Sequence, residues 1–145
     1  MEDKEIVVEE LNTLLRGTYM GIRAFEHHIQ NLDEPELKRT FQSIQQEAKL
    51  NAQKLAERIQ NLNGVPANSE GVTGTMHGFM HKVRLSNDPE GILKDALQGL
   101  EKYGVEYSEE LVKGDLDSES RKIAEEVIDT SRRHAEVIRN VLKQI

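Results

Sequence analysis

Cysteine and tryptophan are absent from the 145-residue sequence, and proline, phenylalanine and tyrosine occur only three times each. The absence of cysteine excludes disulfide bonds, thiolate chemistry, cysteine-bound zinc and iron–sulfur clusters. The scarcity of aromatic side chains leaves few platforms for stacking nucleic acid bases. Basic residues are in deficit, since the net charge is −7 and the pI is about 5.3. Because phosphate binding needs clustered Lys and Arg, we expect no nucleic acid partner.

Long apolar runs are also lacking, so no segment reaches the length of a membrane span. The opening residues, MEDKEIVVEEL, are acidic where a signal peptide carries positive charge. We therefore expect a soluble, cytoplasmic protein without a membrane partner. The length suits one domain over residues 1–145, large enough to bury a core without disulfides or metal.

Apolar residues recur at spacings of three and four along most of the chain, which is the period of an amphipathic helix. The charged fraction of 31% and the abundance of Leu, Glu, Lys, Gln and Ala also favour helix. The predicted long helices cover about residues 3–32, 34–62, 89–113 and 118–145. A loop at 65–74 and a short helix at about 75–85 join the second to the third. The sequence thus predicts an all-α, antiparallel four-helix bundle with a longer central connection that carries a short extra helix.

Turn and capping residues mark the predicted helix ends. Asp33 and Glu36 form a capping-box-like start for the second helix. Asn63-Gly64 followed by Pro66 predicts its end, and Asp117 or Ser118 caps the fourth. The expected inward heptad of the third helix is Leu93, Leu97, Leu100, Gly104, Tyr107 and Leu111. The expected inward residues of the fourth are Ile123, Val127, Thr130, His134, Val137 and Val141.

Glycine occurs inside two predicted helices, at positions 17 and 21 of the first and 99 and 104 of the third. Each costs a helix about 1 kcal/mol relative to alanine. We interpret these glycines as sites where helices approach closely or where a bulky neighbour needs room. A functional opening in the bundle is the alternative.

Several segments resemble the ferritin-like superfamily, which includes bacterioferritin and rubrerythrin. Residues 47–66, EAKLNAQKLAERIQNLNGVP, are similar to the second helix of a bacterial ferritin-like protein. LNTLLRG at 11–17 and SRKIAEEVIDTSRRHAEV at 120–137 resemble the first and fourth helices. TMHGFMHKV at 75–83 is similar to a segment in an uncharacterised family of small bacterial ferritin-like four-helix bundles. The resemblance implies a ferritin-like bundle over nearly the whole chain.

A di-iron carboxylate site in such a bundle needs one Glu from each of two helices and a Glu-x-x-His pair from each of the others. No Glu-x-x-His occurs in this sequence. The resemblance places the ligand positions of the first, second and fourth helices at Thr18, Ala48, Asn51, Ser131 and His134. Only His134 among them keeps a side chain that binds metals, so the resemblance implies a degenerate di-iron site.

The third helix and the haem position give no further ligands. The central heptad positions of the third helix are Leu97 and Leu100, beside Asp95, Gln98 and Glu101. Lys49 stands where bacterioferritin has a haem-binding Met, so the resemblance does not support haem.

We identify no catalytic or cofactor-binding residues in these patterns. The metal candidates are His134 with Glu47 or Glu101, in a site of different design. Otherwise His134 is a bundle histidine hydrogen-bonded to Asn51, Thr18 or Ser131. Glu26 and Glu126 lie, like the two candidate acids, at the edges of apolar stripes, where most such groups are solvated.

The other histidines give weaker signals. His77 and His81 have a spacing of four, which can hold a transition metal, but no third ligand is nearby and we interpret them as exposed. His27 and His28 point about 100° apart on a helix and do not readily share an ion.

Two functional hypotheses follow. The first is a non-enzymatic binding or stress-associated accessory protein that keeps the bundle without its di-iron site. The alternative is a metal-binding di-iron carboxylate protein, ferroxidase-like or iron-storing, with an atypical site and iron as its cofactor. A DNA-protecting mini-ferritin needs a basic arm that the acidic terminus lacks. The sequence leaves self-association into a homo-oligomer open.

Overall fold

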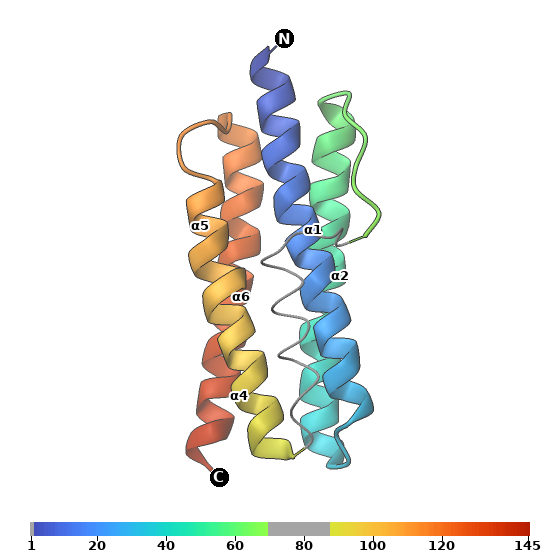
Figure 1. Ribbon diagram of the computed structural model, residues 1–145, viewed down its shortest axis with the longest axis vertical. Coiled ribbons are helices and arrows are strands. Elements are labelled where there is room, and N and C mark those ends of the chain that lie inside the picture. The colour runs from blue at the N-terminus through green and yellow to red at the C-terminus, as the bar shows by residue number, and fades with distance from the viewer. Residues whose placement is uncertain (1, 70–87) are drawn as a thin grey trace.

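The computed structural model describes residues 2–69 and 88–145, and Figure 1 shows the helices side by side. Within these ranges all regular elements are helical. The elements are α1 (Glu2–Gln30), α2 (Pro35–Asn61), α4 (Pro89–Gly99), η1 (Leu100–Tyr107), α5 (Ser108–Leu111) and α6 (Ser118–Lys143). The last residues of the chain, 144 and 145, lie beyond α6. The four predicted long helices are confirmed, with α4, η1 and α5 forming one continuous run. The predicted short helix at 75–85 lies outside the described residues.

The helices form two antiparallel pairs. In Figure 1, α1 and α2 run antiparallel, as do the α4–α5 run and α6. However, α2 and the α4–α5 run point the same way, so the end of α2 and the start of α4 lie at opposite ends of the bundle. This arrangement differs from a simple up-and-down bundle and is the one that ferritin-like bundles have.

Side-chain caps and left-handed residues set the helix ends. Glu34, rather than the predicted Asp33, caps α2 by accepting hydrogen bonds from the backbone N–H groups of Glu36 and Leu37 at 3.1 and 3.0 Å. Asn63 follows α2 with a φ of 66°, as the Asn-Gly signal predicts. Asp117 caps α6 by accepting from the Ser120 N–H at 3.2 Å.

The core consists of two separate apolar clusters. The first, near the start of α1, contains Leu11, Leu14, Leu55, Ile59 and Val127, among others. The second, near the end of α1, contains Phe25, Phe41, Ile44, Leu93 and Ile138, among others. The two clusters lie toward opposite ends of α1, and the middle of the bundle separates them.

The π-helical segment η1 changes the register of the third helix. Ser108 donates a side-chain hydrogen bond to the Tyr103 carbonyl, five residues back, at 2.9 Å. Because the backbone hydrogen bonds of a π-helix join residues five apart and widen the turn, the residues that follow η1 rotate relative to an α-helical heptad. Tyr107, predicted to face inward, is 38% exposed, and Ser108 is buried instead.

In α6 the predicted inward stripe is wrong at one position. Val137 is exposed, and Ala135 and Ile138 are buried beside it. Near the end of α6 the buried face of the helix contains His134, Ala135 and Ile138. Val137 lies just outside this face and is therefore exposed.

None of the described helices has the length and hydropathy needed to cross a membrane.

Candidate functional site: a cavity at the centre of the bundle

A cavity of about 80 Å³ occupies the middle of the bundle. Its wall includes Leu14 and Val127 from the first core cluster and Phe25, Ile44 and Ala96 from the second. The cavity is therefore the gap between the two clusters. α1, α2, the α4–η1–α5 run and α6 all contribute to it.

The positions that the ferritin resemblance singles out converge on this cavity. Thr18 from α1, Ala48 and Asn51 from α2, and Ser131 and His134 from α6 all line it. Leu100, one of the two central positions of the third helix, lines it as well. No Asp or Glu is present among the lining residues in the described part of the chain. The register inferred from sequence thus brings these positions to one place, where the side chains are small, neutral or apolar.

Two of the helical glycines leave the space open. Gly17 and Gly21 line the cavity, and a Cβ added at either would meet no atom of the described residues within 4 Å. The interpretation of close helix approach is therefore wrong for these two positions. It is right for Gly104, where an added Cβ would lie 2.9 Å from Ser131 Oγ.

His28 is a buried polar residue of the wall. Its side chain is 1% exposed, and neither ring nitrogen has a hydrogen-bond partner within the described ranges. The rings of Phe25 and Phe41 meet it edge to face, with centroids 5.7 and 6.0 Å away. Burial lowers the pKa of His28 to about 4, so the imidazole is neutral at pH 7.

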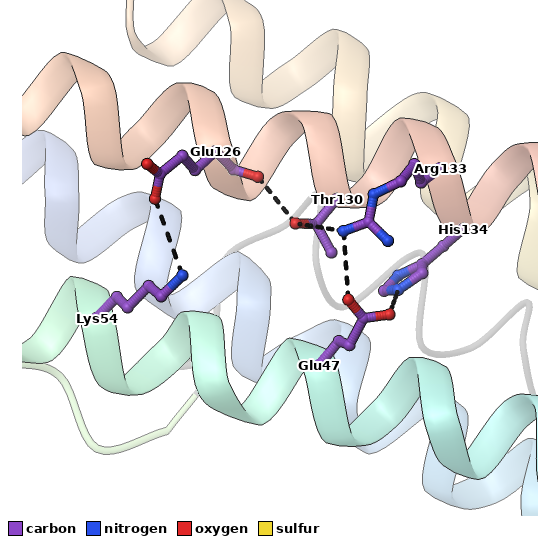
Figure 2. Close-up of polar contacts among 6 residues, drawn as sticks. All are labelled: Glu47, Lys54, Glu126, Thr130, Arg133 and His134. Atoms are coloured by element: carbon purple, nitrogen blue, oxygen red, sulfur yellow. Dashed lines mark hydrogen bonds and ion pairs between the residues drawn. The ribbon is translucent and has the colours of Figure 1, made fainter.

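His134 reaches from α6 toward α2 and meets Glu47 (Figure 2). The distance from His134 Nε2 to Glu47 Oε1 is 3.0 Å, and Arg133 donates to the other carboxylate oxygen of Glu47 at 3.2 Å. The hydrogen-bond partner of His134 is therefore Glu47, and not Asn51, Thr18 or Ser131 as predicted. The hydroxyl of Thr18 donates instead to the Leu14 carbonyl within α1.

The protonation states of this pair follow from its surroundings. The hydrogen bond from His134, together with Arg133, lowers the pKa of Glu47. Burial lowers the pKa of His134, and this effect exceeds the opposing effect of Glu47. A neutral imidazole facing an ionised carboxylate must carry its proton on Nε2 and donate it, which leaves Nδ1 as an acceptor.

The other acidic candidates lie at the rim of the bundle. Glu101 pairs with Arg139 at 2.7 Å and does not meet His134. Glu126 faces Lys54 at 3.8 Å, and Glu26 accepts from Gln30 and Gln45. Of the two acids proposed to join His134, the structure therefore brings only Glu47 to it. In the described part of the chain, no three His, Asp or Glu side chains form a group that could hold a metal ion. His77 and His81 lie outside the described residues.

His28 was predicted only as a helical neighbour of His27, and its place in the core was not predicted. The signal was its spacing of three from Phe25, which sets both on the inner face of α1. The widening at η1 had no comparable signal, because no residue type specifies a π-helix.

Comparisons with known proteins agree with this architecture. A solved structure described as a dodecameric thioferritin, the bacterioferritin-related protein from Bacteroides fragilis, is similar with a TM-score of 0.74. The similarity covers 97% of this chain and 86% of that one, at 16% sequence identity. This likeness confirms the ferritin-like fold. No protein among the curated sequences matches significantly.

Residues 6–114 match a family described as "Domain of unknown function (DUF2383)". The match covers most of α1 and all of α2 and the α4–α5 run, which all contribute to the cavity. The chain therefore belongs to the DUF2383 family and has the ferritin-like fold.

Proposed function

We propose that this protein is a ferritin-like bundle with a degenerate di-iron site, and that it acts as a non-enzymatic binding or stress-associated accessory protein. The observation that carries the proposal is the uncharged wall of the central cavity. Two adjacent metal cations need several carboxylates to bridge them and offset their charge. Thr18, Ala48, Asn51 and Ser131 supply none, so the residues present do not fit such a centre.

The alternative is a metal protein with an atypical site built on His134 and Glu47. Their 3.0 Å contact supports this alternative, since both side chains are metal ligands elsewhere. Against it, Glu47 already neutralises Arg133 at the surface, and a single imidazole and carboxylate leave most of a metal's coordination shell to water.

Anaerobic loading with Fe(II), followed by exposure to oxygen, separates the two hypotheses. Our proposal predicts no stoichiometric iron after desalting and no absorption band from an oxo-bridged pair. The matched control is His134→Ala, because iron that survives this substitution is not held by His134. Stoichiometric iron that is lost in the control variant would favour the alternative.

Self-association is a further part of the proposal. It is supported by the dodecameric state named for the similar thioferritin and by exposed apolar side chains at Leu50, Val65 and Val137. Native mass spectrometry tests it, and a monomer at micromolar concentration would contradict it.

A further inference from the structure

We propose that the central cavity binds a small neutral molecule with an apolar body and one hydrogen-bonding group, such as a short alcohol. This inference rests on the proposed function, because it requires a core that holds no metal.

The space is suited to a small molecule. An apolar cavity of roughly 150 Å³ can hold a molecule the size of benzene, so a cavity of about 80 Å³ has room for a smaller molecule of a few heavy atoms. Gly17 and Gly21 keep part of this space open, although alanine would fit at both positions and would favour helix. Gly17 and Gly21 thus go against the helix preference of the sequence at the positions that line the cavity. Such a departure is expected of functional positions.

The side chains that line the cavity disfavour a charged ligand. Leu14, Phe25, Ile44 and Val127 supply apolar surface, and no described lining residue is an acid, lysine or arginine. Moving an ion from water into such a site carries a large desolvation cost without a partner of opposite charge.

His28 supplies an anchor inside the cavity. Its two ring nitrogens, one a donor and the other an acceptor, lack partners within the described ranges. A buried polar group without a partner is costly, so a ligand that satisfies it gains affinity. A hydroxyl can either donate or accept, and it matches whichever nitrogen faces it. The rings of Phe25 and Phe41 hold the imidazole in place beside the apolar wall.

The test is a titration of the metal-free protein with 1-propanol, followed by methyl NMR. The methyl groups of Leu14, Ile44 and Val127 report on the cavity, and those of Leu116 report on the end of the bundle. We expect saturable shifts confined to the cavity methyls. Propylammonium, which has the same length but a positive charge, should give none, and dissolved xenon should bind as a purely apolar probe.

Variants locate the ligand. The double variant Gly17→Ala/Gly21→Ala should weaken propanol and xenon binding about tenfold or more while its thermal stability is retained or raised. His28→Leu should weaken propanol binding roughly threefold to tenfold, which is the value of one hydrogen bond, and change xenon binding less than twofold. Thr13→Ala, on α1 but away from the cavity, is the matched control and should leave both affinities unchanged.

Unsaturable shifts, or shifts unaffected by the glycine substitutions, would overturn the inference. So would a cavity in which NMR detects ordered water that propanol does not displace. Failure of this inference can be told apart from failure of the proposed function. Absence of both iron and propanol binding contradicts only the inference, whereas stoichiometric iron in the core contradicts both.

Discussion

At the scale of single residues, two groups outside the candidate metal positions have strongly shifted pKa values. They are the buried His28 and the half-buried Glu10. Burial lowers the pKa of His28 to about 4, whereas burial and a hydrogen bond to Asp115 raise the pKa of Glu10 to about 7. Between about pH 4.5 and pH 6.5 the two groups change stability in opposite directions. The pH profile of the intact protein therefore hides both contributions, and single variants should reveal them.

His28→Leu should flatten the loss of stability in acid. The folded state holds His28 neutral, so the unfolded state takes up a proton first as pH falls below 6.5. Stability from this group is complete above pH 6.5 and is lost on the way down to about pH 4. From pH 6.5 to pH 5 the loss is about 1.5 kcal/mol. Urea unfolding of both proteins at both pH values should show that the parent protein loses this much more stability than the variant between pH 6.5 and pH 5, because the opposing contribution of Glu10 is common to both.

Glu10→Gln should have the opposite pH dependence. The raised pKa means that the folded state binds the proton more tightly, so Glu10 lowers stability as pH rises from about 4.5 through 7. The substitution keeps a neutral hydrogen-bonding group beside Asp115. We expect a gain of about 1 kcal/mol at pH 8, limited by solvent screening at this half-buried position, and almost none at pH 4.5. An equal gain at both pH values would contradict the assignment.

At the scale of elements, helix identity and helix order follow from local signals, whereas the inner register of the third helix does not. The apolar period, Asn63-Gly64 and Asp117 predicted where helices run and end. Tyr107 was misplaced because η1 rotates the face that follows it, and no residue type marks such a widening in the sequence. The cap of α2 moved by one residue, to Glu34, a shift that local preference does not decide.

Alanine substitutions at two helical glycines should have opposite signs. Gly17→Ala should stabilise the protein by about 1 kcal/mol, because the added methyl group meets no atom of the described residues within 4 Å and α1 gains helix propensity. Gly104→Ala should destabilise it by roughly 1–3 kcal/mol, because the new Cβ would lie 2.9 Å from Ser131 Oγ. Urea denaturation of the two variants and the parent measures both effects. Stabilisation by both substitutions would show that Ser131 moves aside freely.

At the scale of the whole molecule, the sequence predicts the ferritin-like fold. It predicts only some of the side chains and contacts at the centre of the bundle. The ferritin resemblance placed Thr18, Ala48, Asn51, Ser131 and His134 in register, and all five line one cavity. That Glu47 rather than Glu101 meets His134 could not be read from the chain, since both acids flank apolar stripes and only the arrangement of α2 against α6 distinguishes them. Whether the lost carboxylates leave a void or a filled core also depends on packing in three dimensions.

The core of the bundle, where the ferritin resemblance implies iron, is a cavity without a charged side chain among its described lining residues. Anomalous X-ray diffraction at the iron edge, from crystals soaked anaerobically in Fe(II), locates any metal bound there. We expect no anomalous peak between Thr18, Asn51 and His134. A pair of well-occupied iron peaks at that position would show that the core holds a di-iron centre after all.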